Sequence, residues 1–540
     1  MAADSVAGNG INPSASIEAR LKTFRIFLLL GAVALYPLWF LYTANLAYIR
    51  LADLLRPLLV SLILLGGLYL LLARLLKDRA RAALLAAAWW GLFSVYGHVY
   101  QALRGGAGAL GLLGKHSLLA PLFLLLAALA GVAIARSRRD FRPAVSAGAL
   151  LVGIMLLLAL APAASRGLFT PAGAAATGDA PAARAALDLP RIAEAERPDI
   201  YYIVLDTYSR ADVIEKEVGL DISPFLDALA QRGFVTAGCS LSNYDSTRVS
   251  LTSSLNMDYL PALDARFTPE NDNNAIMDTY IIHSKVRATL EAQGYTTYAF
   301  ATGFNFTEWT DADVYIAPQP SSPLDAEAQP FEALWLKTTA LRALFDTRPA
   351  ALSGVLNWLG FPHGAHVRRQ LNLLDRLPAL AAEPGPKFVF AHVILPHVPF
   401  VFRADGSVTT DDRYFREQFD QPVSQDYVVD GYRNQVEYLN GRLIAIVDQI
   451  LRDSANPPLI ILQGDHGLLY AEHNPILNSY YLPGEPQAEI PEEITPVNTF
   501  RLIFNRYFQA GLPLLEDQAY ASTYSAPYNF TPVTFDCPVK

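Results

Sequence analysis

The chain has 540 residues, of which 52% are hydrophobic, and a formal net charge of −9. This length exceeds that of an ordinary single domain. The charge is divided unevenly: residues 1–170 hold 16 Lys+Arg and 5 Asp+Glu, whereas the remainder holds 26 and 46. A strongly acidic C-terminal part excludes nucleic acid as an expected partner.

Five apolar stretches in the first 170 residues are each long enough to cross a bilayer. A buried core helix explains one such stretch, but not five in succession, and a first stretch followed by further spans does not fit a cleavable signal peptide. We therefore predict a multi-span α-helical membrane domain over residues 1–165. The predicted spans are 24–45, 54–76, 82–103, 117–135 and 144–164.

Basic residues gather before the first predicted span and in alternate loops. Arg20, Lys22 and Arg25 precede the first span, and two further basic groups lie between spans two and three and between spans four and five. By the positive-inside rule the N-terminus is cytoplasmic, and five crossings place everything after Ala164 outside. The expected location is the inner (plasma) membrane, with the C-terminal part in the periplasm or at the cell exterior. The two loop groups are Arg74, Lys77, Arg79, Arg81 and Arg136, Arg138, Arg139, Arg142.

Residues 166–197 are rich in Ala, Pro and Gly and are predicted to form a linker, some of it lying along the membrane surface. In residues 198–540 strands and helices alternate, which predicts an α/β ectodomain with a mostly parallel central sheet. The expected strands are 199–206, 233–237, 296–302, 387–395 and 458–463, and the expected helices are 223–230, 286–292, 330–345, 365–381 and 427–452.

Two of the expected strands end in candidate metal ligands. The apolar run 459–462 leads to Asp465 and His466, and the run 200–205 leads to Asp206. Ligands bind at the carboxyl edge of such sheets, and a carboxylate beside an imidazole suits one divalent metal, Zn²⁺ or Mn²⁺. The alternative is that these side chains only cap the segments that follow.

Hydroxyl side chains cluster in the segment 242–256, just before a helical periodicity. A hydroxyl at a helix N-terminus lies where the backbone N–H groups favour negative charge, and a nearby metal would make it a nucleophile. The alternative is that Ser246 or Thr247 is an ordinary N-cap.

These motifs, in this order and together with the loop Leu395-Pro-His-Val-Pro-Phe400, resemble the sulfatase-like branch of the alkaline phosphatase superfamily. With several spans ahead of them, they are most similar to membrane-bound phosphoethanolamine transferases and lipoteichoic acid synthases. The resemblance implies that Asp206, Thr247, Asp465 and His466 hold the metal and that Thr247 is the nucleophile, since Thr247 and Ser250 match the family's Thr-x-x-Ser. The Cys/Ser-x-Pro-x-Arg sequence of true sulfatases is missing at Cys239, so formylglycine chemistry is not expected.

Three further residues are candidates for contact with the substrate. His397 stands in a loop at a strand end, where functional residues concentrate, and the resemblance implies that it contacts the phosphate or protonates the leaving group. The resemblance also implies a substrate-side role for His473. Arg248 would clamp a phosphate oxygen, or would be a solvated arginine at a helix start. His392, inside an expected strand, is interpreted as a core histidine rather than a substrate contact.

The remaining histidines and the two cysteines carry weaker signals. His98 and His116 are interpreted as packing or interfacial residues, and His283, His363 and His366 as surface or structural ones. Cys239 and Cys537 either form a disulfide that tethers the C-terminus or remain unpaired.

The resemblance implies a transferase that moves a phospholipid head group, of phosphoethanolamine or phosphoglycerol type, through a phosphothreonine onto a glycan or lipid of the cell envelope. The expected partners are thus a membrane phospholipid donor and an envelope acceptor. The first alternative is a membrane-anchored sulfatase-like hydrolase or phosphodiesterase. The second, from another class, is a catalytically silent binding module on the same scaffold.

Overall fold

The computed structural model describes residues 13–44, 51–104, 109–159, 185–318, 330–347, 363–409, 425–468, 473–484, 490–523, 526–534 and 537. The described residues divide into two compact units. The first unit contains the N-terminal helices together with a segment within 327–355, and the second contains the rest of the chain from residue 176 onward. The predicted boundaries 1–165, 166–197 and 198–540 remain a prediction.

The first unit is entirely helical in its described residues. Four of its helices are long and apolar enough to cross a membrane, and the apolar helix α6 is shorter. Residues 160–164 of the predicted fifth span lie outside the described residues. The helices of this unit are α1 (Pro13–Ala44), η1 (Leu51–Leu54), α2 (Leu55–Leu76), α3 (Arg79–Arg104), α4 (Ala109–Leu113), α5 (His116–Arg136), α6 (Arg142–Leu158), α15 (Pro330–Thr338) and α16 (Leu341–Thr347).

Helices α15 and α16 follow the segment 242–256 in sequence but pack within the first unit. Phe331 and Trp335 of α15 are buried in the same apolar cluster as Trp90 of α3. The Glu332 carboxylate accepts two hydrogen bonds from the Arg56 guanidinium at the start of α2. The helix expected at 330–345 therefore exists as two short helices, and its partners are the membrane helices.

The second unit is built around a seven-stranded sheet in the order β2-β7-β6-β1-β5-β3-β4. The five strands from β6 to β4 are parallel, whereas β7 is antiparallel to β6 and β2 to β7. The predicted mostly parallel sheet is confirmed. Its strands are β1 (Ile200–Leu205), β2 (Val235–Thr236), β3 (Thr296–Phe300), β4 (Val314–Ile316), β5 (Lys387–Val393), β6 (Leu459–Gly464) and β7 (Asn478–Tyr481).

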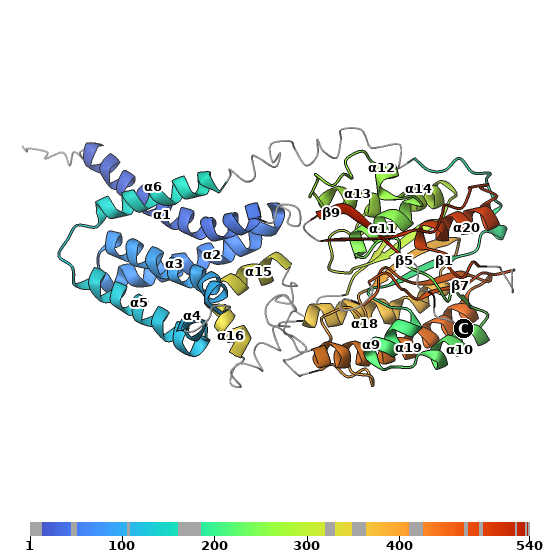
Figure 1. Ribbon diagram of the computed structural model, residues 1–540. Helices are drawn as coiled ribbons and strands as arrows, with labels where there is room; N and C mark the ends of the chain where they lie inside the picture. The colour runs from blue at the N-terminus through green and yellow to red at the C-terminus, as the bar shows by residue number, and fades with distance from the viewer. Residues whose placement is uncertain are drawn as a thin grey trace, which may run out of the picture. The chain divides into compact units, whose positions relative to one another are not determined.

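Helices cover both faces of this sheet (Figure 1). Residues of β1 alternate between the two faces. Tyr201, Ile203 and Leu205 pack in the apolar cluster covered by α9, α10, α18 and α19. Ile200, Tyr202 and Val204 pack in the cluster covered by α11, α14 and α20. Burial on both faces explains why β1 and β6 are continuous apolar runs. The helices are η3 (Glu194–Glu196), α9 (Ala211–Val218), α10 (Ser223–Gln231), α11 (Thr247–Asn256), α12 (Leu260–Leu263), α13 (Ala275–Ile282), α14 (Lys285–Ala292), α18 (Gly364–Arg376), η4 (Pro378–Ala382), α19 (Gln425–Asp453) and α20 (Pro496–Phe508).

A separate C-terminal hairpin, β8 (Ala519–Thr523) with β9 (Ala526–Val533), was not expected from the sequence. Tyr520 of this hairpin bridges to Tyr244, three residues before Thr247. A disulfide joins Cys239 to Cys537, so the pairing of the two cysteines is confirmed. The hairpin is thus fixed beside the segment that carries the candidate nucleophile.

Candidate active site and metal centre

Asp206 and Asp465 lie next to each other because they follow neighbouring parallel strands. Leu205, the last residue of β1, is in register with Gly464, the last residue of β6. A Cβ atom on Gly464 would lie 2.4 Å from the carbonyl oxygen of Tyr208, so only glycine permits this close approach of the two strand ends. Both carboxylates are buried, with 2% of each residue exposed.

The backbone turns sharply between the two carboxylates at Thr207, whose φ is +63°. This left-handed conformation is costly for a β-branched residue. It is held by two contacts: the Thr207 N–H donates to Oδ1 of Asp465 (3.0 Å), and the Tyr432 hydroxyl of α19 donates to the Thr207 carbonyl oxygen (2.8 Å). The strained turn fixes the Asp465 carboxylate beside Asp206.

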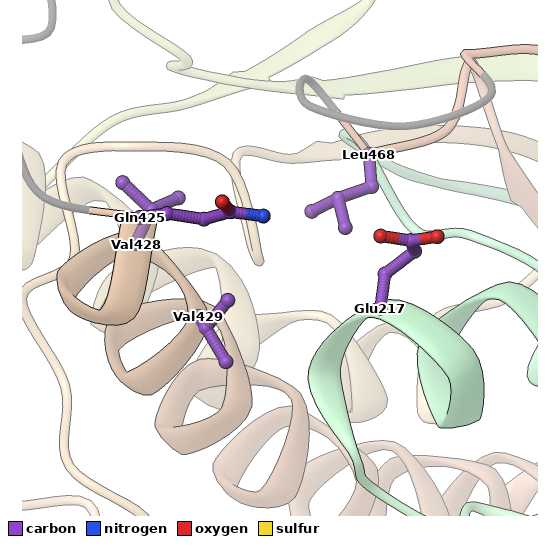
Figure 2. A pocket seen from close by; sticks show the side chains of 5 residues that line it. All are labelled: Glu217, Gln425, Val428, Val429 and Leu468. Atoms are coloured by element: carbon purple, nitrogen blue, oxygen red, sulfur yellow. The ribbon is translucent and has the colours of Figure 1, made fainter.

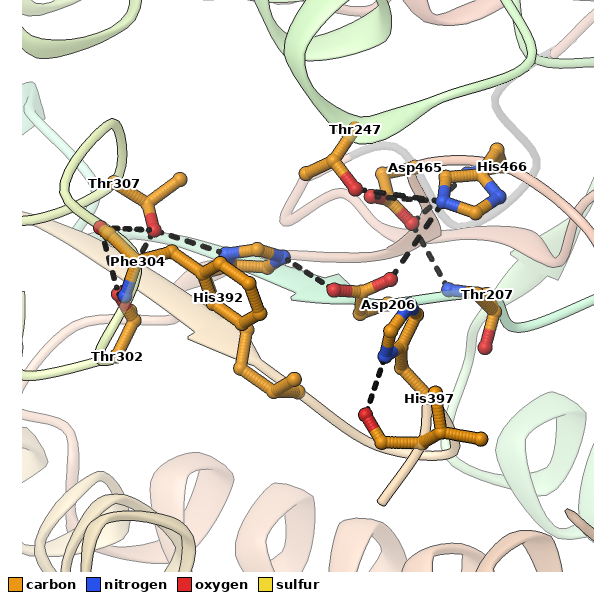
Figure 3. Close-up of polar contacts among 12 residues, drawn as sticks. Asp206, Thr207, Thr247, Thr302, Phe304, Thr307, His392, His397, Asp465 and His466 are labelled. Carbon is orange, nitrogen blue, oxygen red and sulfur yellow. Dashed lines mark hydrogen bonds and ion pairs between the residues drawn. The ribbon is translucent and has the colours of Figure 1, made fainter. Parts of the chain in front are cut away.

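The His466 ring presents a nitrogen to both carboxylates (Figure 3). Its Nδ1 lies 3.0 Å from the carbonyl oxygen of Gly467, which can only accept, so Nδ1 carries a proton. Its Nε2 lies 3.7 Å from Oδ1 of Asp206 and 3.8 Å from Oδ2 of Asp465. Neither of these two buried oxygens has a hydrogen-bond partner within the described part of the chain. Buried carboxylate oxygens without donors are costly unless a cation binds them.

Thr247 completes this group from the opposite side (Figure 3). It is the first residue of α11, and its Oγ1 lies 3.4 Å from Nε2 of His466. Ligands about 2.0–2.2 Å from a tetrahedral zinc ion lie about 3.3–3.6 Å from one another. The distances of 3.4, 3.7 and 3.8 Å around Nε2 are close to this spacing. Nε2 of His466 therefore lies near ligand spacing from the other three side chains, which is compatible with a shared divalent metal.

His392 also faces the site, which the sequence interpretation as a core histidine did not anticipate. It lies on β5, fully buried, with Nε2 3.5 Å from Oδ2 of Asp206 and Nδ1 3.3 Å from Oγ1 of Thr307. Ligand atoms of Asp206, His392 and Asp465 all lie within 4.8 Å of one another. The available signal was a histidine inside an otherwise apolar strand near its carboxyl end.

The charges of the cluster shift the pKa values of its two carboxylates in opposite directions. Burial raises the pKa of Asp206, but the imidazoles of His397, His392 and His466 outweigh burial, and the net pKa is below its usual range. Burial lowers the pKa of His466, but Asp465 and Asp206 outweigh burial and raise it. Burial and the charge of Asp206 raise the pKa of Asp465. Two buried carboxylates this close require a positive partner.

The other two predicted histidines, His397 and His473, have contacts near this group. His397 lies beside Asp206 in Figure 3, with its Nδ1 2.5 Å from the carbonyl oxygen of Val398. The carbonyl oxygen of His473 accepts from the N–H of Gly467. Burial and the charge of His466 lower the pKa of His473, and Asp245 opposes them. Both positions are compatible with contact to a substrate, and their roles remain a prediction.

Arg248 has protein partners in the structure. Its Nε lies 3.1 Å from Oδ1 of Asp278, its Nη2 donates to Oδ1 of Asn305 (3.3 Å), and its guanidinium stacks over Phe306 at 4.5 Å. It is therefore not the solvated arginine of the alternative interpretation. These contacts account for its burial without a substrate.

His366 on α18 was assigned no role from the sequence, yet it lies close to the site. It is buried, and its Nε2 has no hydrogen-bond partner among the described residues. Burial, with the charges of Arg369, His363 and His397, lowers its pKa well below the usual value. The charges of His397 and Asp206 both act on this imidazole, a link between distant segments that sequence spacing gave no means to predict.

Comparison with known proteins identifies the family. No curated protein matches the chain. Among solved structures, the zinc complex of the C-terminal periplasmic domain of EcEptC from Escherichia coli is 12% identical, with a TM-score of 0.38, over 64% of this chain and 96% of that one. The integral membrane lipooligosaccharide phosphoethanolamine transferase A from Neisseria meningitidis is 12% identical, with a TM-score of 0.36, over 89% and 96%. The phosphonate monoester hydrolase of Agrobacterium radiobacter is 15% identical, with a TM-score of 0.36, over 60% and 80%.

The family model described as Sulfatase matches residues 198–536, which is the larger part of the chain. The match includes β1, β5, β6 and the start of α11, the elements that bring together the two carboxylates, the histidines and the threonine. The chain therefore belongs to the sulfatase family.

Proposed function

We propose that this protein is a metal-dependent membrane phosphotransferase. It moves a phospholipid head group of phosphoethanolamine or phosphoglycerol type onto an envelope glycan or lipid through a phosphothreonine at Thr247. The metal ligands are Asp206, Thr247, Asp465 and His466, and the metal is Zn²⁺ or Mn²⁺. The observation that carries the proposal is the distance of 3.4 Å between Oγ1 of Thr247 and Nε2 of His466, at the N-terminus of a buried helix.

The first half of the reaction forms one bond and breaks another. The Oγ1 atom of Thr247 attacks the phosphorus of the donor diester, and the bond from phosphorus to the diacylglycerol oxygen breaks. A bound divalent cation would lower the pKa of the threonine hydroxyl and offset charge on the phosphoryl oxygens. The backbone N–H groups at the start of α11 stabilise negative charge at the same place.

The second half regenerates the threonine. An acceptor hydroxyl attacks the phosphothreonine, the bond between phosphorus and Oγ1 breaks, and the head group leaves on the acceptor. His397 and His473 are assigned to proton transfer. In the first half one takes the proton of the Thr247 hydroxyl and the other gives a proton to the leaving diacylglycerol oxygen. In the second half the roles reverse: the acceptor hydroxyl gives up its proton, and a proton returns to Oγ1 of Thr247. Arg248 has no part in this scheme, because its guanidinium is engaged by Asp278 and Asn305.

The apolar helices of the first unit support a lipid donor. The phosphate of a phospholipid lies at the bilayer interface, and an enzyme with several membrane helices is held at that interface, whereas a soluble hydrolase needs no such helices. The distribution of basic loop residues supports a cytoplasmic N-terminus and a catalytic unit outside the inner membrane.

The test is covalent trapping. The full chain, purified in detergent and loaded with Zn²⁺ or Mn²⁺, is incubated separately with phosphatidylethanolamine and phosphatidylglycerol, and the intact mass is measured. We expect one head-group phosphate per chain, on the peptide that contains Thr247, and no adduct in Thr247→Ala. Ser246→Ala is the matched control, because it removes the neighbouring hydroxyl and should keep the adduct. An adduct in Thr247→Ala, or none in the loaded wild-type protein, would contradict the mechanism.

Membership of the sulfatase family also supports a second candidate, a membrane-anchored hydrolase or phosphodiesterase. The two differ in the fate of the head group. In a single turnover with labelled donor, a transferase passes the label to a lipid or glycan acceptor, whereas a hydrolase releases it to water at the same rate with and without acceptor.

A further inference from the structure

An open hollow of about 750 Å³ lies beside the candidate active site. It shares residues with the segments that carry the site: Asp245 precedes Thr247 by two positions, and His473 follows the metal motif in β6. The charge of Asp245 also acts to raise the pKa of His466 and that of His473. The full lining is Leu241, Asp245, His473, Asn474, Pro475, Ala521, Val533 and Thr534.

The C-terminal hairpin forms one wall of this hollow and is firmly attached there. Both oxygens of Asp245 accept from Ser522 of β8, one from its N–H (2.9 Å) and the other from its hydroxyl (3.2 Å). The Asn474 amide donates to the carbonyl oxygens of Ser242 (3.1 Å) and Tyr520 (3.2 Å). The wall is thus formed before any substrate binds, and preorganisation favours specific binding.

The charge of the lining selects for a cation. Asp245 is the charged residue of the lining and is only partly buried, and no Lys or Arg is among the described residues that line the hollow. Each carboxylate oxygen can accept a second hydrogen bond in addition to the one from Ser522. Asp245 is therefore a charged acceptor near the candidate active site. It has no Lys or Arg partner among the described residues that line the hollow.

A second hollow is much smaller and differs in character (Figure 2). It is lined by Glu217 of α9, Gln425, Val428 and Val429 of α19, and Leu468. None of these residues belongs to the metal centre or to the threonine segment. The 750 Å³ hollow is the one of the two that shares residues with the threonine segment.

We propose that the hollow beside Thr247 binds the ammonium end of an aminoalkyl phosphate head group, with the Asp245 carboxylate as its counter-charge. The donor class is then a phospholipid with a primary ammonium group rather than one with a neutral polyol. That the bound lipid is the donor of the reaction rests on the proposed function. The preference for an ammonium group is a property of binding and is measured without turnover.

The experiment compares two soluble head groups that differ in the ammonium group. The full chain in detergent, loaded with metal, is titrated calorimetrically with O-phosphoethanolamine and with glycerol 3-phosphate. We expect the wild-type protein to bind O-phosphoethanolamine about fivefold to tenfold more tightly. Asp245→Asn keeps the shape of the side chain and should reduce this ratio to about one. Ser522→Ala removes a contact to Asp245 without removing its charge and should keep the ratio above threefold.

Equal affinities in the wild-type protein, or an unchanged ratio in Asp245→Asn, would overturn the proposal. The trapping assay separates this failure from failure of the proposed function. An adduct from phosphatidylglycerol but not from phosphatidylethanolamine would overturn the ammonium site and leave the transferase mechanism intact. A binding preference that depends on Asp245, without any adduct on Thr247, would support the site and contradict the mechanism.

Discussion

Nε2 of His392 lies 3.5 Å from Oδ2 of Asp206, on the side of the carboxylate away from His466. A histidine in this position orients the carboxylate that we assign to the metal, and such supporting contacts typically contribute 10- to 100-fold to metal affinity. We therefore predict that His392→Ala weakens zinc binding by about that factor. A competition titration with a chelating dye measures the change.

His366→Ala is the matched control for this prediction, since it removes a buried imidazole of α18 whose Nε2 has no hydrogen-bond partner among the described residues. It should change zinc affinity less than threefold. If His392→Ala binds zinc as tightly as the wild-type protein, His392 is a core residue, as its sequence context suggested.

The disulfide between Cys239 and Cys537 closes a sequence separation of 298 residues and should hold the C-terminal hairpin in place. Replacing both cysteines with serine should destabilise the attachment by about 2–4 kcal/mol. The expected result is faster proteolysis within 519–533, measured by mass spectrometry, and the same acceleration in the reduced wild-type protein. As a control, a reductant should not accelerate proteolysis of the double variant any further. Equal protection of the oxidised and the reduced wild-type protein against proteolysis would show that the hairpin is held without the disulfide.

Acid should weaken the packing around Asp264. Burial raises its pKa, but hydrogen bonds from Arg266 and Tyr280 outweigh burial and lower the pKa to about 2. Because the folded pKa is below the unfolded value of about 3.9, the stabilisation is present above about pH 4 and is lost as the pH falls through about 2. Allowing for solvent screening at this partly exposed site, it amounts to about 1 kcal/mol.

The measurement is the difference in free energy of unfolding between the wild-type protein and Asp264→Asn as a function of pH. The difference should be constant between pH 7 and 5 and should shrink below pH 4. A difference that grows on acidification has the wrong sign and would refute the assignment.

The ion pair between Arg56 and Glu332 attaches α15 to the start of α2. Glu332 is 8% exposed, and Glu332→Ala should destabilise this attachment by about 1 kcal/mol. Cleavage within 330–347 by an added protease should become faster, while cleavage of the catalytic unit stays unchanged. Glu383→Ala, at an exposed residue, is the control. Unchanged cleavage in Glu332→Ala would mean that burial of Phe331 and Trp335 alone holds the helix.

The sequence predicted the sheet and the core of the site because both depend on local signals. The apolar runs that became β1 and β6 are buried on both faces, and the polar residues that end them meet at one edge by strand register. The cluster of hydroxyl residues ahead of a helical periodicity indicated the segment 242–256, and the resemblance to the family's Thr-x-x-Ser selected Thr247 within it. Each of these signals lies within a few residues.

Other features depend on contacts between distant segments, which spacing does not reveal. The sequence around His392 is that of a core residue. The strand register shows that His392 is the last residue but one of β5 and lies opposite Val204. The packing of α15 with the membrane helices requires the partners Trp90 and Arg56. The hairpin 519–533 has little apolar alternation, and it is fixed by contacts to distant segments: the hydrogen bonds to Asp245, the disulfide, and the packing of Tyr528 against Tyr244 and Phe267.

The most direct test is the metal content of the purified full chain, measured by mass spectrometry of the dissolved metal after loading and dialysis. We predict one Zn²⁺ or Mn²⁺ per chain in the wild-type protein and in Asp405→Asn, an exposed control, and none in Asp465→Asn. Retention of the metal by Asp465→Asn, or a wild-type protein that binds none, would contradict the metal centre on which the proposed reaction depends.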